Sequence, residues 1–201
     1  MYKIQVTLPD RTIKTVPSGT TPQDIADSIG PRLAQDVVVA NVNGGLVDLN
    51  LDLQEDCTLE LITGDRVEGH DVLLHSTAHL MAHAVKKLYP DVKITIGPTI
   101  KNGFYYDFDL DETFSDNDLE KIEIKMRELS TAGHDITRQE IPTEDAIKFF
   151  NGIGETYKVE IIEQIDPEET ISAYSQDDFT DLCRGPHVSN TKKIKYFKLL
   201  N

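Results

Sequence analysis

The sequence has little cysteine, no tryptophan and no long apolar segment. Two cysteines among 201 residues, Cys57 and Cys183, are too few for a disulfide framework, so we expect a reducing, cytoplasmic setting. No apolar run approaches the roughly 20 residues that a membrane span requires. The first ten residues lack the pattern of a secretory signal. These absences exclude disulfide-stabilised secreted proteins and membrane-spanning proteins, and no membrane partner is expected.

Basic residues are also scarce. The chain holds 20 Lys and Arg against 35 Asp and Glu, which gives a net charge of −15. This balance argues against a protein that grips nucleic acid by bulk electrostatics. It still allows a module that handles one nucleic-acid end while another part of a larger protein supplies the grip. The local basic groups at Lys86-Lys87 and along Lys192–Lys198 are expected to be solvated surface.

Residues 1–63 form a first predicted domain. Apolar residues alternate from Tyr2 to Leu8, and Thr12–Val16 completes a hairpin. Thr21-Pro22 begins a helix that Gly30-Pro31 ends. Further strands are expected at Val37–Val42, Leu46–Val47 and Leu59–Thr63. A hairpin, a helix and then further strands is the element order of a β-grasp fold.

Residues 64–201 form a second, larger predicted domain. Apolar residues at helical spacing predict a helix over Asp71–Leu88. The other expected elements are strands at Lys93–Ile96, Phe104–Leu110, Asp135–Ile141, Ile171–Ser175 and Tyr196–Leu199, a Ser115-capped helix over Asp116–Thr131 and a Thr143-capped helix through Phe150. This mixture predicts an α+β domain with a catalytic cleft.

Two short motifs carry the chemistry: His75-Ser-Thr-Ala-His79 and Cys183-Arg-Gly-Pro-His187. On a helix, residues i and i+4 lie on one face, so His75 and His79 are expected to point the same way. Gly185-Pro186 predicts a turn for the second motif. Three imidazoles and a thiol in one pocket would make either a metal site or a site that activates water.

The residues alone leave three chemistries open. His75, His79, Cys183 and His187 are enough ligands for a zinc ion. Without a metal, a neutral histidine with a pKa near 6.5 could act as base or orient water. Cys183 could also be a nucleophile, because a thiol near histidine can be activated as thiolate. Histidines that merely pack on a helix are the structural alternative.

Other residues have weaker signals. Lys158 is either a surface residue or a cation that holds a phosphate, and Asp181 could orient a histidine or a ribose hydroxyl. Gly97 and the segment Gly103–Tyr106 allow close backbone approach to a ligand. His83, one helical turn beyond His79, is expected to pack or to bind a supporting partner. No function is expected for His70 or His134.

These residues together resemble a known family. His75-Ser-Thr-Ala-His79-Leu-Met-Ala-His83-Ala-Val, Ile96-Gly-Pro with Gly103-Phe-Tyr-Tyr-Asp107, and Asp181-Leu-Cys-Arg-Gly-Pro-His187 are similar to the amino-terminal half of bacterial-type threonyl-tRNA synthetases. The resemblance covers essentially the whole chain. It implies a TGS domain, a β-grasp module, over residues 1–63 and a tRNA editing domain, the second additional domain of threonyl- and alanyl-tRNA synthetases, over residues 64–201.

The resemblance implies hydrolytic editing of seryl-tRNA made with threonine tRNA. Serine lacks only one methyl of threonine, a difference worth roughly 1–3 kcal/mol in binding, so a second site must remove the wrong product. The implied catalytic residues are His75, His79, Cys183 and His187. The implied substrate-binding residues are Lys158, Asp181, Gly97 and Tyr106.

The resemblance also implies cofactors and partners. Metal-free editing is favoured, although the related alanyl editing domain binds zinc through the same spacings. ATP and zinc are expected only in an aminoacylation domain that this chain lacks, so no ligase activity is expected from it alone. The implied partners are the serine-carrying acceptor end of threonine tRNA and the rest of the synthetase, a homodimer at full length. The alternatives are a free-standing trans-editing factor, a zinc-dependent acyl-ester hydrolase and a non-catalytic RNA- or partner-binding module.

Overall fold

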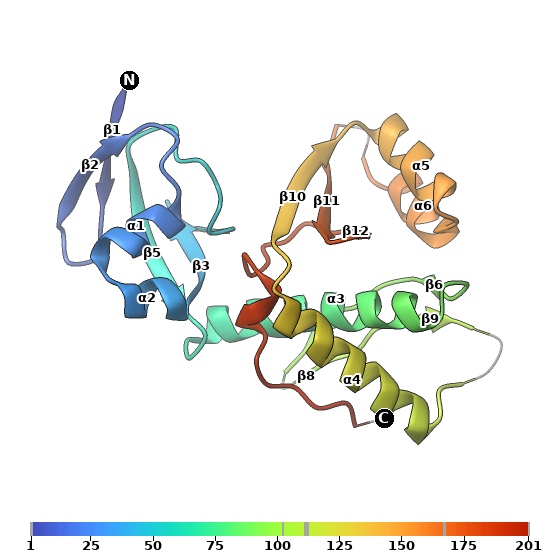
Figure 1. The fold of residues 1–201 in the computed structure, drawn as a ribbon. Helices are drawn as coiled ribbons and strands as arrows, with labels where there is room; N and C mark the ends of the chain where they lie inside the picture. Colours follow the sequence, from blue (N-terminus) through green and yellow to red (C-terminus); the bar gives the residue numbers. More distant parts are fainter. Residues whose placement is uncertain (1, 102, 111–112, 167, 201) are drawn as a thin grey trace. The chain divides into compact units, whose positions relative to one another are not determined.

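The computed structural model describes residues 2–101, 103–110, 113–166 and 168–200 (Figure 1). The chain divides into two compact units, which are described separately. The first unit comprises residues 1–73 and 185–189, and the second comprises residues 74–184 and 190–201. No helix in the described part of the chain is long and apolar enough to cross a membrane.

The first unit contains a five-stranded sheet with the strand order β2-β1-β5-β3-β4. Strands β1 and β5 pair in parallel, and the other neighbours pair antiparallel. The elements are β1 (Lys3–Thr7), β2 (Ile13–Pro17), α1 (Pro22–Ile29), α2 (Pro31–Asp36), β3 (Val37–Val42), β4 (Gly45–Val47) and β5 (Cys57–Thr63). The predicted β-grasp order is confirmed.

Local sequence explains this unit well. Ile4 and Val6 alternate along β1 and are fully buried in an apolar core. Thr21 caps α1 through a capping box with Asp24, as its position predicted. Gly30 ends α1, but Pro31 then starts the short helix α2, which the sequence analysis missed because proline also favours the first helical turn.

Helix α3 (Val67–Leu88) begins four residues before the predicted Asp71, and the second unit includes it from Leu74 onward. The further elements are β6 (Lys93–Ile94), β7 (Thr99–Ile100), β8 (Gly103–Phe104), β9 (Phe108–Asp109), α4 (Asp116–Ala132), β10 (Ile136–Ile141), α5 (Thr143–Gly152), α6 (Thr156–Glu163), β11 (Ile171–Gln176), β12 (Phe179–Leu182) and a 3-10 turn at Thr191–Lys193. With the β-grasp unit, this mixture confirms the α+β class.

An antiparallel sheet with the order β10-β11-β12 organises part of the second unit. Helices α5 and α6 pack against β11 through one apolar cluster. Its buried members are Ala146, Phe150, Val159, Ile162, Ile171 and Ala173. Ser115 caps α4 as predicted, and Gly133 ends α4 in the left-handed conformation with a φ of 77°.

Three predictions for the second unit are wrong. Phe104–Leu110 is divided between the separate two-residue strands β8 and β9. Tyr196–Leu199 is not a strand, because its Leu199 N–H donates to the carboxylate of Glu123 on α4 rather than to a neighbouring strand. Thr143 lies within α5 instead of capping it. Helix α6, strands β7 and β12 and the 3-10 turn at Thr191–Lys193 were not predicted.

Candidate active site

Helix α3 presents His75 and His79 on one side, as their spacing predicted. Their ring centroids are 5.0 Å apart and the rings meet edge to face at 69°. The helix is fixed in place by the apolar residues around these histidines, because Ala78, Leu80 and Val85 are fully buried. His79 is itself only 6% exposed.

Cys183 reaches the same place from the end of strand β12. Its N–H donates to the Ser172 carbonyl oxygen at 3.1 Å, and the Ser172 hydroxyl donates to the Cys183 carbonyl oxygen at 2.6 Å. These two bonds to β11 fix the backbone of Cys183, and its Sγ lies 3.0 Å from Nε2 of His75. Thiol and imidazole therefore share one hydrogen bond, with the donor set by the histidine tautomer.

Asp181 is the buried charge at the centre of the cluster, with 1% of its surface exposed. Its Oδ2 lies 3.4 Å from Nδ1 of His79 and accepts a hydrogen bond from the Tyr106 hydroxyl at 2.5 Å. Its Oδ1 lies 2.6 Å from Nζ of Lys158. Since a buried carboxylate is costly unless it is paired, these contacts explain how Asp181 is tolerated there.

Lys158 projects from α6 and is also buried, with 2% exposed. In addition to Asp181, its ammonium donates to the Thr95 carbonyl oxygen at 2.6 Å and to the Tyr106 hydroxyl at 3.1 Å. Two hydrogen bonds and one ion pair thus surround the ammonium of Lys158. Substrate binding by Lys158 stays a prediction.

Gly97 and Tyr106 are in close contact. A Cβ atom at Gly97 would lie 2.1 Å from Cδ2 of the Tyr106 ring, a distance no side chain can adopt. The absence of a side chain at Gly97 thus allows the tyrosine to reach Asp181. Whether these two residues line a substrate pocket, as expected, stays a prediction.

Burial controls the protonation of the cluster. It lowers the pKa of His75, against the opposing influence of Asp181. It lowers the pKa of His79 far more, and the nearby His75 and Lys158 act in the same direction. Burial, together with Asp181, raises the pKa of Tyr106 well above its ordinary value. At neutral pH the cluster therefore holds two neutral imidazoles and a protonated phenol.

The donor set would suit zinc chemically. His75, His79 and Cys183 each offer a ligand atom, and the three atoms lie within 4.8 Å of one another. Two ligands of a tetrahedral zinc are about 3.5 Å apart, given bond lengths near 2.0 Å to nitrogen and 2.3 Å to sulfur. The 3.0 Å between Nε2 of His75 and Sγ of Cys183 is the length of a direct hydrogen bond.

His187 belongs to the first unit, together with residues 185–189. The Gly185-Pro186 peptide is cis, and the motif forms no helix, as its composition predicted. The His187 N–H donates to the Asp48 carboxylate of the same unit at 2.8 Å. His187 lies four positions after Cys183 in the sequence, and its catalytic role stays a prediction.

The expected cleft also stays a prediction. One cavity of about 690 Å³ in the second unit is lined by another face of α3, with Leu74, Met81 and Val85, and by α4. A second cavity of about 220 Å³ is lined by His83, Lys86 and Lys87. Neither cavity has His75, His79 or Cys183 in its lining.

Sequence reasoning missed the groups that support this cluster. Ser172 and the Thr95 carbonyl oxygen hold Cys183 and Lys158, yet nothing in their local sequence marks them. Glu155, a buried carboxylate that precedes α6, had only its spacing of three residues from Lys158 as a signal. Backbone acceptors and distant partners become visible only in the folded chain.

Two family models match the sequence. Residues 4–63 match the TGS domain. Residues 171–201 match the threonyl and alanyl tRNA synthetase second additional domain. The first match covers most of the β-grasp unit, and the second includes β11, β12, Asp181 and Cys183.

Curated relatives extend this similarity over nearly all of the chain. A threonine–tRNA ligase of Citrifermentans bemidjiense is 51% identical over 199 residues, which is 99% of this chain and 31% of the relative. Threonine–tRNA ligases of Pelobacter propionicus and Symbiobacterium thermophilum are 48% and 46% identical, over 100% and 98% of this chain and 31% and 30% of their own lengths. The chain thus spans about a third of its relatives' length, and it belongs to the threonyl-tRNA synthetase family, in the amino-terminal region that carries the TGS and second additional domains.

Proposed function

We propose that the second unit hydrolyses the ester between serine and the 3′-terminal adenosine of threonine tRNA. One observation carries the proposal: Asp181 is buried between Lys158 and His79, a histidine that burial keeps neutral. A buried ion pair beside a neutral imidazole has the composition of a proton-transfer site. The similarity to threonine–tRNA ligases and to a second additional domain supports the choice of ester.

Asp181 gives His79 its role in this proposal. The carboxylate faces Nδ1, which favours the tautomer that carries its proton on Nδ1 and leaves the lone pair on Nε2. Nε2 then accepts a proton from the water that attacks the seryl carbonyl carbon. The proton passes to the 3′ oxygen as the ester bond breaks, which releases serine and restores the ribose hydroxyl.

Cys183 and His75 act together as a second pair. Their hydrogen bond holds the His75 ring in one orientation, from which it can stabilise charge that develops on the carbonyl oxygen. Attack by the Cys183 thiolate with an acyl-enzyme intermediate is the alternative. A Cys183→Ser variant that keeps most of the activity would favour the water route.

Size selection explains why serine and not threonine would be removed. A pocket that selects threonine by binding favours it over serine by only roughly 1–3 kcal/mol, the contribution of one methyl group. A pocket with a rigid wall that fits serine can exclude threonine, because the extra methyl collides with the wall. Tyr106 is held by Asp181, Lys158 and its contact with Gly97, so it provides such a wall in our proposal. A catalytic role for His187 is proposed from its motif, Cys183-Arg-Gly-Pro-His187, alone.

We propose that this hydrolysis needs no metal. The support is the direct contact between His75 and Cys183, which is shorter than the separation of two zinc ligands. If zinc were bound instead, His75, His79, Cys183 and His187 would be its ligands and it would supply an activated water. For the complete enzyme we propose that a further domain activates threonine with ATP. We also propose that the complete enzyme binds threonine tRNA and forms a homodimer.

The test is hydrolysis of purified seryl- and threonyl-tRNA, both made on threonine tRNA, by the 201-residue chain at high concentration. We expect selective loss of the seryl ester, no effect of a zinc chelator, and loss of activity in His79→Ala. His70→Ala is the matched control, since His70 is an exposed residue near the start of the same helix. Equal stability of both esters, or full activity in His79→Ala, would contradict the proposal.

A further inference from the structure

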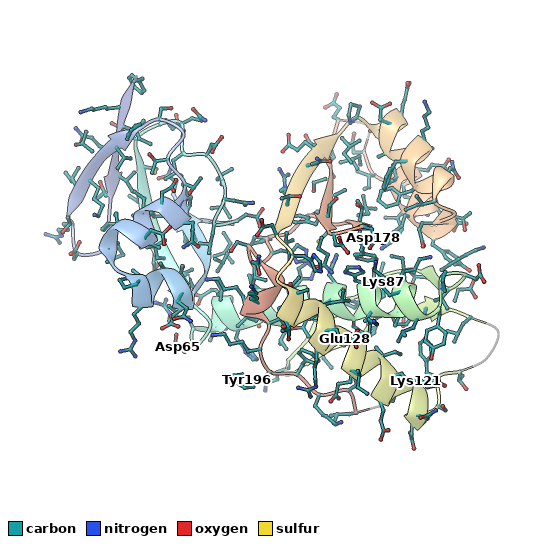
Figure 2. All side chains as sticks on the ribbon, in the orientation of Figure 1. Asp65, Lys87, Lys121, Glu128, Asp178 and Tyr196 are labelled. Atoms are coloured by element: carbon teal, nitrogen blue, oxygen red, sulfur yellow. The ribbon has the colours of Figure 1, made fainter. Side chains whose placement is uncertain are left out.

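The last turn of α3 carries two adjacent lysines that the sequence analysis expected to be solvated. In the structure each one binds a carboxylate on a different element. Lys86 binds Glu155, which directly precedes α6, and Lys87 binds Asp178, in the turn between β11 and β12. Figure 2 shows Lys87 and Asp178 next to each other beside α3.

The Lys86 contact is the more buried of the two. Its Nζ lies 2.7 Å from Oε1 of Glu155, whose side chain is 2% exposed. It also donates to the carbonyl oxygens of Pro90 and Val92 at 2.9 and 2.8 Å. The other oxygen of Glu155 accepts from the Ile94 N–H at 3.0 Å. Lys86 and Glu155 therefore join the end of α3, strand β6 and the start of α6.

The Lys87 contact fixes the β11–β12 turn. Its Nζ lies 2.6 Å from Oδ2 of Asp178, and Oδ1 of Asp178 lies 3.2 Å from Nε2 of His83 on the same helix. The His83 ring stacks on Phe179, the first residue of β12, with centroids 5.2 Å apart and an angle of 12°. The turn is thus held to α3 by charge, hydrogen bonding and stacking.

The two carboxylates that bind Lys86 and Lys87 have the same sequence spacing from residues of the candidate site. Glu155 lies three residues before Lys158, and Asp178 lies three residues before Asp181. Lys158 and Asp181 then meet at 2.6 Å, so the contacts form a closed loop that starts and ends at neighbouring residues of α3. The same helix carries His75 and His79, and the loop therefore fixes the Lys158–Asp181 pair relative to both histidines.

We propose that Lys86 and Lys87 are positioning residues that hold α6 and β12 so that Lys158 and Asp181 meet beside His79. The activity readout of this inference rests on the proposed hydrolysis; the structural readout does not. Lys86 should have the larger effect, because its partner is buried, whereas Asp178 is 66% exposed and water weakens that pair.

The activity test uses single-turnover hydrolysis of seryl-tRNA at varied enzyme concentration. Lys86→Met should lower the maximal rate between about 10-fold and 100-fold, the range that a misplacement of about 1 Å can cost, with little change in half-saturation. Lys87→Met should have a smaller effect, and Lys86→Arg should recover most of the rate. Lys125→Met is the matched control. Lys125 forms a solvent-accessible ion pair with Glu128 on the same helix, α4, at 2.5 Å.

The double variant Lys86→Met/Glu155→Gln is the control for misfolding, because it leaves no unpaired buried charge. It should melt near the wild-type temperature and still react slowly. Amide hydrogen exchange supplies the readout that needs no activity: Lys86→Met should speed exchange in α6, and Lys87→Met in β12. Exchange that rises uniformly, or in neither element, would overturn the inference.

The outcomes separate the two proposals. If the wild-type chain hydrolyses the seryl ester and both methionine variants match it, the positioning role is wrong and the proposed function stands. If the wild-type chain leaves the ester intact, the proposed function fails, and the exchange experiment alone decides the positioning role.

Discussion

The two units differ in what lies inside them. The core of the β-grasp unit is apolar, with Ile4, Ile25 and Leu59 among its buried side chains. Among the described residues, every buried histidine, lysine, aspartate and glutamate side chain except His187 belongs to the second unit. These residues are His79, His83, Glu123, Glu155, Lys158 and Asp181. Since buried charge is weak evidence for stability, this difference favours the proposed hydrolysis in the second unit over a purely structural role for these side chains.

The largest expected effect is on the pair at the centre of the second unit. Asp181→Asn leaves the Lys158 ammonium buried without its counter-charge, which costs about 3–5 kcal/mol of unfolding free energy. Hydrogen exchange resolved by segment should show the loss in the second unit, with the first unit protected as in the wild type. An equal loss of exchange protection in both units would contradict the contrast between an apolar first unit and a charged interior in the second.

Removing both charges separates stability from activity. The double variant Lys158→Met/Asp181→Leu has no buried charge to desolvate, so its unfolding free energy should return toward that of the wild type. Its seryl-tRNA hydrolysis should be absent, because His79 has lost the carboxylate at its Nδ1. A double variant that regains activity along with stability would show that the pair is only structural.

A core truncation in the first unit is the matched test. Leu59 is 1% exposed, and Leu59→Ala should cost about 3 kcal/mol through lost burial and a cavity. Exchange should rise in the β-grasp unit, while the rate of seryl-tRNA hydrolysis, measured below the melting transition, changes little. A loss of activity as large as that expected for Lys158→Met/Asp181→Leu would mean that the two units are not independent.

A smaller effect is expected where Gly97 meets Tyr106. Gly97→Ala places a methyl in the Tyr106 ring, so the ring must move and its bond to Asp181 weakens; overpacking of this kind costs about 1–3 kcal/mol. Seryl-tRNA hydrolysis should fall more than stability does. Adding Tyr106→Leu should relieve the overlap and restore stability without restoring activity.

An effect confined to low pH is expected for a carboxylate of the second unit that lies outside the cluster. Burial tends to raise the pKa of Glu123, but bonds from Arg127, the Leu199 N–H and Lys198 outweigh it and lower the pKa from 4.5 to about 2. The unfolded state therefore binds a proton first as pH falls, so this stability is complete above about pH 4.5 and is lost toward pH 2. Glu123→Gln should flatten the pH dependence of the melting temperature in that window, and an unchanged slope would contradict the assignment.

The same contrast explains what the sequence could predict. In the first unit, alternation along β1 and the Thr21 cap led to the correct strands and first helix. Two of the elements missed in the second unit have charges at interior positions. Strand β12 buries Asp181, and α6 buries Lys158, so each breaks the apolar period that would have revealed it.

The candidate site was predictable to a similar extent. The spacing of His75 and His79 placed their rings together, because it depends only on helix geometry. The pairs formed by Lys158 with Asp181 and by Lys86 with Glu155 join residues far apart in the chain. No local pattern fixes such a pairing, and the lysines at the end of α3 were therefore expected to face solvent.

The most direct test compares single-turnover hydrolysis of seryl- and threonyl-tRNA, both on threonine tRNA, by the wild-type chain and by Lys158→Met/Asp181→Leu. The account predicts that the wild type removes only serine, and that the double variant is folded and inactive on both esters. Hydrolysis of seryl-tRNA by the charge-free double variant at the wild-type rate would contradict the central claim that the buried ion pair of the second unit supports the chemistry.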